Sequence, residues 1–344
     1  MITDTEYLQK QRYVGDSEAD SLVTHLFESR QEKTLYQALG TPAEHLHSLS
    51  DANKELHSFI HTPKEKPAWY DAEKIALGQR FYRKYASEIM MLLGAMSLPY
   101  CYAASPGNKA LHLTEKMRNK PGKRLLETAQ YVIQLMEPGS FEPDGIAHPY
   151  INKTRLVHAM VRYMLLKKTD WNMDWGLPIN QEDMAGTNLA FSFTIINGLE
   201  KQQFPLRQEQ SDAFLHIWRY IGYQMDIQEE LLADNMQEAA ALEYVIRKRH
   251  FKASIEGRKL MQDLLEHYRD EFPWPAGQLV EHQIRYFLGE EISDMLKIEK
   301  NTGKDALIRV INKVKNGINR HFHFSTYNTM MKNHERLKKI HGDM

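Results

Sequence analysis

The sequence predicts an all-α protein, built as a single large multi-helix bundle domain. Apolar residues recur at helical spacing along nearly the whole chain, and almost no stretch alternates like a half-buried strand. The 344 residues are enough for one large domain with a substantial core, and no internal repeat divides them. One stretch, residues 154–193, sets charged groups among apolar ones, which predicts a buried polar site between two central helices.

Composition narrows the class of protein. Lys and Arg number 44 against 45 Asp and Glu, so no overall positive field favours nucleic acid as a partner. Cys101 is the only cysteine, which excludes a disulfide within the chain. Residues 1–20 lack an apolar signal core, and the longest uncharged run near the middle, 184–199, is short and polar for a membrane span. We therefore expect a cytoplasmic protein without a membrane span.

The first 70 residues predict short helices that wrap the main domain. Helical patterns cover 17–29, 32–40 and 52–61, and a connector broken by prolines follows at 61–69. Asp71 is a plausible N-cap for a long helix whose apolar second half continues through 100–104. The Ser-Pro-Gly-Asn sequence at 105–108 predicts a break, and the next amphipathic helix covers 123–136.

The remaining elements follow the same reasoning. A helix over 148–168 and a second one that begins after Asn180 flank a Trp-rich turn at 171–178. Further helices are expected at 207–225, at 235–272 with a break near 252–254, and at 279–296 with a turn at Gly289. Two last helices, 304–324 and 327–341, lie in the segment 301–344, which we expect to pack on the same domain.

The helix 148–168 carries the first candidate site residues. Arg155, His158 and Arg162 are spaced i, i+3, i+7 and share one face of a helix that is otherwise apolar nearly all round. A buried arginine must meet a carboxylate, a phosphate or another anion, and a neutral imidazole can ligate a metal ion. The alternative is structural: both arginines form ion pairs, and His158 is a satisfied core histidine.

The second helix offers polar groups at its start. Asp183, three residues after Asn180, is a capping group, a partner for Arg155 or Arg162, or a catalytic acid. Thr187 continues the polar seam at i+7 from Asn180 and lies beside Gly186, so a neighbouring helix or a flat cofactor could come close there. Arg219 is a further lone cation on the apolar helix 207–225. The chain has no Gly-rich phosphate loop and no G-x-S-x-G nucleophile motif, so these patterns alone name no reaction.

At these residues the sequence resembles a known family, the MpaB-type oxygenases, which share a catalytic domain with the rubber oxygenases (latex clearing proteins). The matching blocks occur in order at 100–104, 154–162, 175–193, 217–223 and 284–296, and those at 154–162 and 175–193 are the most specific. The resemblance implies a catalytic domain over residues 71–300. It also implies an all-α fold that holds a b-type haem between helices, and an oxygenase that uses dioxygen on an apolar, isoprenoid-type substrate.

The resemblance also implies roles for the candidate residues. His158 is expected to ligate the haem iron, and Arg155, Arg162 and Arg219 to pair with the haem propionates or with Asp183. Thr187 and Asn188 are expected beside the cofactor, and Arg155 and Asp183 are the candidate catalytic residues. The alternative function is a haem-free helical protein that binds a lipid or another hydrophobic small molecule, which the 17 methionines favour. The oligomeric state stays open.

Overall fold

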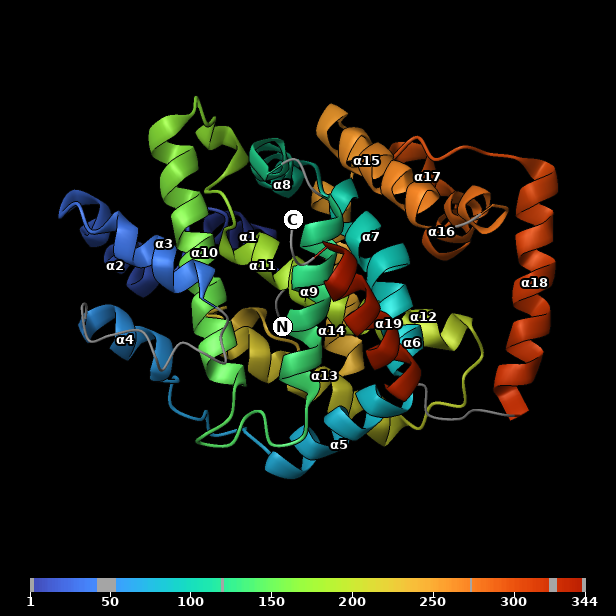
Figure 1. The fold of residues 1–344 in the computed structure, drawn as a ribbon, viewed down its shortest axis with the longest axis horizontal. Helices are drawn as coiled ribbons and strands as arrows, with labels where there is room; N and C mark the ends of the chain where they lie inside the picture. The colour runs from blue at the N-terminus through green and yellow to red at the C-terminus, as the bar shows by residue number, and fades with distance from the viewer. Residues whose placement is uncertain (1–2, 42–53, 119–120, 273, 322–326, 342–344) are drawn as a thin grey trace.

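The chain folds as helices throughout the residues that the computed structural model describes, which are 3–41, 54–118, 121–272, 274–321 and 327–341. Within these ranges there is no β-strand, and β-type pairing is limited to an isolated bridge between Ala104 and Phe251. The predicted all-α class is therefore confirmed (Figure 1). None of the described helices is both long and apolar enough to cross a membrane.

Three N-terminal helices lie against α10 (Ala147–Lys168), as Figure 1 shows at the left. They are α2 (Ser17–Glu28), α3 (Glu32–Gly40) and α4 (Lys54–His61), whereas α1 (Thr5–Gln11) packs against α11 (Gln181–Phe191). An apolar cluster joins the three helices to α10, with Leu26 of α2 and Ile60 of α4 packed together with Leu156 and Ala159. The predicted helices at 17–29, 32–40 and 52–61 correspond to α2, α3 and α4, except that residues 52 and 53 lie outside the described ranges.

The long helix expected after Asp71 exists in pieces. Asp71 is the N-cap, as predicted, and its carboxylate accepts hydrogen bonds from the backbone N–H groups of Glu73 and Lys74 at 3.0 and 3.1 Å. The pieces are α5 (Ala72–Lys84), α6 (Ala86–Leu92), a π-helical turn η2 (Leu93–Ser97) and α7 (Leu98–Ala103). Pro99 in the first turn of α7 has no N–H for the carbonyl four residues earlier, which is consistent with a π-turn at this point.

The Ser-Pro-Gly-Asn sequence starts a helix, α8 (Ser105–Arg118), instead of only breaking one. Pro106 falls in the first helical turn, where its missing N–H has no intrahelical partner in any case, and the predicted break is present between α7 and α8 at Ala104. The helix expected at 123–136 is α9 (Pro121–Met136).

The second half of the chain closely follows the predicted pattern. Ser192, with φ −114° and ψ −83°, divides the second central helix into α11 (Gln181–Phe191) and α12 (Phe193–Lys201). The predicted break near 252–254 and the turn at Gly289, where φ is +80°, are both present. The other elements are η3 (Met173–Trp175), α13 (Gln208–Gln224), η4 (Glu229–Leu231), α14 (Met236–His250), α15 (Ile255–Glu271), η5 (Ala276–Gln278), α16 (Val280–Leu288), α17 (Glu290–Met295), α18 (Thr302–His321) and α19 (Tyr327–His341).

The main core lies in the middle of the molecule, where α13 packs against α5 and carries the buried aromatic residues Phe214, Trp218 and Tyr220. A separate cluster joins α7 to α15 and α16, which are on the right in Figure 1. α19 packs on α6 and α9, and α18 packs on α16 at the outer edge. α11 is enclosed by α1, α7, α12, α13 and α14, whereas α10 packs mainly against α2 and α4.

Candidate functional site

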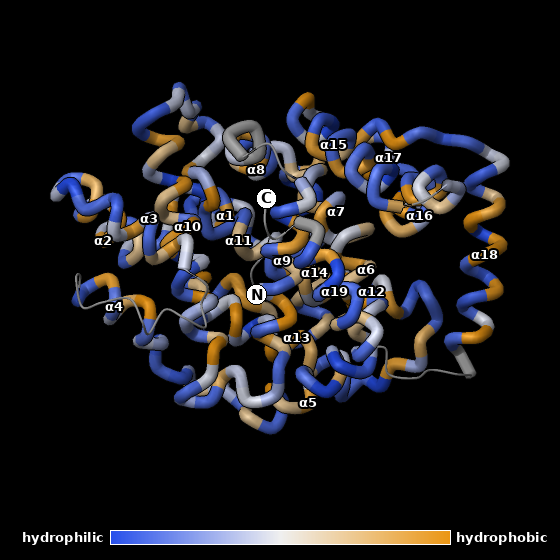
Figure 2. The backbone as a smooth tube through the Cα atoms, in the orientation of Figure 1, coloured by the Kyte–Doolittle hydropathy of each residue, from blue (hydrophilic) through white to orange (hydrophobic). Residues whose placement is uncertain are grey.

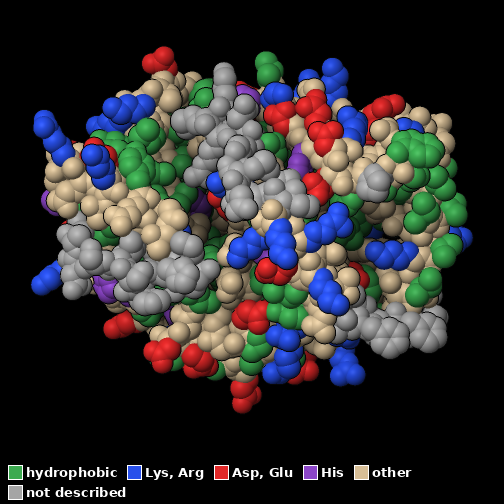
Figure 3. Space-filling model, viewed as in Figure 1, with side chains coloured by type: hydrophobic (Ala, Val, Ile, Leu, Met, Phe, Trp, Pro, Cys, Tyr) green, Lys and Arg blue, Asp and Glu red, His purple; other side chains and the backbone are tan. Residues whose placement is uncertain are grey.

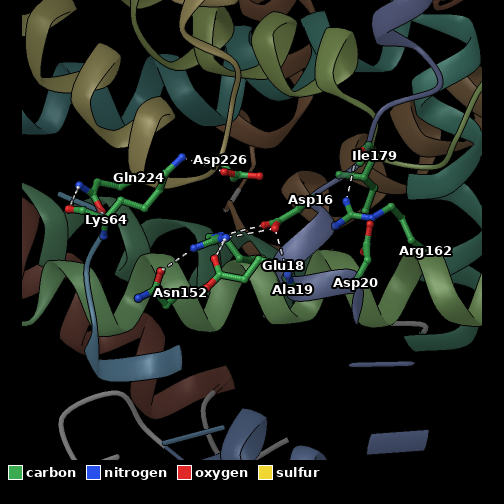
Figure 4. A network of polar contacts seen from close by, with 12 residues as sticks. Asp16, Glu18, Ala19, Asp20, Lys64, Asn152, Arg162, Ile179, Gln224 and Asp226 are labelled. Atoms are coloured by element: carbon green, nitrogen blue, oxygen red, sulfur yellow. Dashed lines mark hydrogen bonds and ion pairs between the residues drawn. The ribbon is translucent and has the colours of Figure 1, made fainter. Parts of the chain in front are cut away.

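Arg155 on α10 is held by Asp16 and Glu18 at the start of α2. Figure 4 shows these two acids, and beside them Asp20 with Arg162. The Nε and Nη2 atoms of Arg155 donate to the two carboxylate oxygens of Asp16 at 2.7 and 3.1 Å, and Nη2 also donates to Glu18 at 2.8 Å. Arg155 and Asp16 are 3% and 5% exposed, so this bidentate ion pair is buried. Asp16 also caps α2 through the backbone N–H of Ala19, so one carboxylate fixes both helices.

Arg162 repeats this arrangement two turns further along α10. Its Nε donates to Asp20 at 2.7 Å, and its Nη1 donates to the carbonyl of Ile179 at 3.0 Å. Its Nη2 atom is buried and has no hydrogen-bond partner. Pairing of Arg155 or Arg162 with Asp183, one of the expected alternatives, is therefore not found, because both arginines pair with acids at the start of α2.

Asp183 lies in the first turn of α11, where its carboxylate meets Arg12 and the side chain of Asn180. Asn180 is the N-cap, as predicted: its side chain accepts from the backbone N–H of Asp183 at 3.0 Å and donates to the Asp183 carboxylate at 2.8 Å. The other carboxylate oxygen of Asp183 accepts from Arg12 at 3.0 Å. The catalytic roles expected for Asp183 and Arg155 are tested by none of these contacts and stay predictions.

The segment 12–16 fastens the N-terminus to the beginning of α11. The carbonyls of Val14 and Gly15 accept from the backbone and the side chain of Gln181, each at 3.0 Å. The carbonyl of Arg12 accepts from the N–H of Leu177 at 2.8 Å. Gly176 is required beside it, since φ is +80° and an added Cβ would lie 2.6 Å from the Arg12 carbonyl. The sequence patterns did not reveal this segment as part of the site.

A small cavity lies where α10, α11 and the N-terminal segment meet. Its volume is about 10 Å³, room for about one water molecule. Two of its lining side chains, His158 and Arg162, each have a buried nitrogen atom without a hydrogen-bond partner, Nδ1 and Nη2 respectively. The structure thus brings together three predicted site residues around this cavity, whose full lining is Gly15, Asp16, Arg155, His158, Arg162, Ile179, Gln181, Met184 and Met225.

His158 is uncharged at neutral pH. Burial lowers the pKa of its imidazole to about 4, and the nearby cation of Arg162 acts in the same direction, against a smaller opposing effect of Asp16. A neutral imidazole is the form that ligates metal ions. Its Nε2 atom makes no hydrogen bond to any described residue. On α10, His158 lies between the buried face of Arg155 and Arg162 and a half-exposed face that carries Thr154 and Val161.

Thr187 and Asn188 lie on α11, outside the lining of the small cavity. Thr187 is exposed although neighbouring helices enclose α11, so solvent reaches the interior of the bundle at this point. Figure 3 shows the surface hollowed between the lobe that contains α2 and α10 and the centre of the molecule. The Cys101 thiol contacts Thr187, and burial raises the pKa of this thiol to about 12, which keeps it protonated. Asn188 donates to the carbonyl of Trp218 at 2.8 Å.

Arg219 lies apart from His158. Its guanidinium stacks 4.0 Å from the centre of the Trp69 ring and pairs with Asp234. It lines a different, open cavity of about 530 Å³, together with Leu232, Leu242 and several carboxylates. Pairing of Arg219 with Asp183, the same expected alternative, is therefore not found either.

A second buried charge cluster was missed by the sequence patterns. Glu182 on α11 is fully buried and accepts from His250 at 2.9 Å and from Arg249 at 2.8 Å, and Arg12 lies 3.5 Å away. Burial acts to raise the pKa of Glu182, but the hydrogen bonds from His250 and Arg249 outweigh it and hold this pKa below its usual range. We call Glu182, Arg12, Arg249 and His250 the Glu182 cluster. It joins α11, α14 and the N-terminal segment 12–16.

Three histidines predict acid sensitivity of the fold. Burial lowers the pKa of His148, His158 and His216 from 6.5 to about 4. Between pH 4 and pH 6.5 these histidines bind protons in the unfolded chain but not in the folded chain. The free energy of unfolding should therefore fall as the pH falls from 6.5 towards 4, and the three histidines should leave it level above pH 6.5. Urea unfolding at a series of pH values measures this slope. His158→Gln should reduce the slope, and the exposed control His25→Gln should leave it unchanged; an equal slope in both variants would refute the assignment.

The comparisons with known proteins agree with this architecture. Residues 82–314 match the family model described as ER-bound oxygenase mpaB/B'/Rubber oxygenase, catalytic domain. A rubber oxygenase of Streptomyces sp. (strain K30) is 21% identical over 300 residues, which are 86% of this chain and 74% of the relative. The solved structure of latex clearing protein LCP in the closed state superposes with a TM-score of 0.75 at 19% identity, over 95% of this chain and 90% of the other. The chain therefore belongs to the family of mpaB/B' and rubber oxygenase catalytic domains, as an oxygenase-type enzyme.

Proposed function

We propose that this protein is a haem-dependent oxygenase in which His158 ligates the iron of a b-type haem. The observation that carries the proposal is the state of His158: a neutral imidazole, with a buried Nδ1 atom that has no hydrogen-bond partner, within an oxygenase catalytic domain. The substrate we propose is an apolar molecule of the isoprenoid class, which reacts with dioxygen. This class follows the rubber oxygenase to which the chain is similar.

The residues fit the haem in part. His158 fits as the axial donor, and the solvent-accessible region at Thr187 fits the expectation that this residue and Asn188 lie beside a cofactor. Arg155 does not fit as a partner of the propionates, because Asp16 and Glu18 already bind it, and Arg162, bound to Asp20, keeps only its Nη2 atom unpartnered. The cavity of about 10 Å³ between these arginines is also far smaller than the several hundred Å³ of a typical cofactor site.

In this proposal Arg155 and Arg162 hold His158, the proposed iron ligand, in position. A bound haem would supply the iron that binds and activates dioxygen. Arg155 fixes α10 to α2, and the cation of Arg162 disfavours protonation of His158, which keeps the imidazole available to a metal ion. Met184 and Met225 contribute apolar side chains to the lining of the small cavity. Further methionines, Met90, Met91 and Met96, are partly buried against the core, and such adaptable side chains suit an apolar substrate.

The visible absorption spectrum of protein expressed with a supply of haem tests the proposal. We expect a Soret band and about one iron per chain, and we expect His158→Ala to lose both. His148→Ala is the matched control: His148 is on the same helix and also has a pKa of about 4, but its Nε2 contacts the Tyr220 hydroxyl at 3.2 Å. A colourless, iron-free protein after reconstitution with haem would overturn the proposal and favour the haem-free protein that binds a lipid or another hydrophobic small molecule.

A further inference from the structure

α18 packs on the protein with a polar face. Asn312 and Gln283 of α16 exchange hydrogen bonds between their side-chain amides at 3.1 and 3.3 Å. Asn316 donates to the carbonyl of Lys201 at 3.1 Å. Asn312, Asn316 and Ile308 are all buried, so two of these three inward side chains are amides. A surface helix normally buries its apolar face, whereas α18 buries a mainly polar face.

The outward side of α18 is an apolar stripe. Its spacing is i, i+3, i+4, i+7, i+11, which places all members on one face of the helix. Figure 2 shows hydrophobic residues along the free edge of α18, and Figure 3 shows hydrophobic side chains gathered on the same edge. The apolar face of α18 consists of Leu307, Val310, Ile311, Val314 and Ile318, which are 47%, 59%, 43%, 61% and 56% exposed.

Cations border this apolar face on both sides. At 100° per residue, Lys304 and Lys315 fall on one flank, and Lys313 falls on the other. The only acidic residue of α18, Asp305, is engaged by His282 at 2.7 Å on the inward side. The exposed charge of the described part of α18 is therefore entirely positive. A second copy of the chain on this face would bring like charges together, which disfavours a symmetric dimer here.

We propose that the apolar face of α18 lies in the surface of a lipid bilayer that contains anionic headgroups. Aliphatic side chains beside lysine and arginine are the pattern of helices that lie in the membrane interface without spanning it. The cations reach the headgroups along their aliphatic stems and are attracted by negative lipid charge. α18 thus holds the oxygenase domain on the membrane surface. This inference does not depend on the haem at His158, and either can fail without the other.

Sedimentation with vesicles tests the proposal on the full chain. We expect binding to vesicles of phosphatidylcholine mixed with phosphatidylserine, weaker binding to phosphatidylcholine alone, and release by salt. Ile311→Glu with Val314→Glu should lower the partition coefficient about tenfold or more, because two charges enter the apolar face. Lys313→Glu with Lys315→Glu should remove the preference for phosphatidylserine.

The matched control is Leu166→Glu with Ile255→Glu, which makes the same kind of change at two isolated exposed positions and should leave vesicle binding unchanged. Thermal unfolding monitored by circular dichroism confirms that each variant is folded. The proposal is overturned if the folded native chain does not bind the mixed vesicles, or if the Ile311 and Val314 variant binds them as well as the control. It is also overturned if light scattering shows a dimer that this variant converts to a monomer.

Discussion

Glu182→Gln is expected to lower the free energy of unfolding by about 3–5 kcal/mol. The fully buried Glu182 carboxylate is the shared partner of His250 and Arg249 and lies 3.5 Å from Arg12. A neutral amide leaves Arg249 without its carboxylate partner, and it leaves Arg12 with the carboxylate of Asp183 alone. Urea denaturation at neutral pH measures the loss.

The control for this variant is Glu6→Gln. Glu6 pairs with Lys10 on the surface of α1, where both side chains are largely exposed, so no measurable change in unfolding is expected. Equal stabilities of Glu182→Gln and Glu6→Gln would show that the Glu182 cluster does not hold the N-terminal segment in place.

Arg155→Met is expected to destabilise the fold by a similar amount, about 3–5 kcal/mol, because it leaves Asp16 buried without its cation. The double variant with Asp16→Asn should recover part of this loss, so that the two substitutions are not additive. Lys259→Met, which breaks an ion pair with a half-exposed lysine, should have little effect.

The same variants separate two roles for Arg155. A structural arginine changes the free energy of unfolding, and the double variant restores part of it. A catalytic arginine would leave unfolding unchanged in Arg155→Met while turnover is lost. Additive losses in the Arg155 and Asp16 variants would contradict the structural coupling that their contacts predict.

Local sequence signals predicted the helices well, because the relevant interactions lie within a few residues. Asp71 and Asn180 were identifiable as N-caps, and Gly289 as a turn, from residue type and spacing alone. The differences from the prediction lie beside prolines, because a proline can interrupt a helix or stand in its first turn. Pro106 stands in the first turn of α8, directly after the predicted break, and Pro99 follows a π-turn inside an expected long helix. The proposed division at residues 70 and 300 stays a prediction.

The candidate site was only partly predictable, because its partners are distant in sequence. The pattern at 155–162 correctly indicated two buried arginines that need anions. It could not indicate that Asp16, Glu18 and Asp20 supply them, since about 140 residues separate the pairs and no local spacing links them. The run of acids at 16–20 was the one available signal. Charge complementarity between this run and the two arginines would have favoured α2 over α11.

The most direct test of the account is rescue of the His158→Gly variant by free imidazole. Reconstituted with haem, this variant should lack the Soret band of the native protein, and added imidazole should restore it by occupying the space that the side chain leaves. The same substitution at His148 should need no rescue. A His158→Gly protein whose spectrum equals that of the native protein before imidazole is added would contradict ligation by His158.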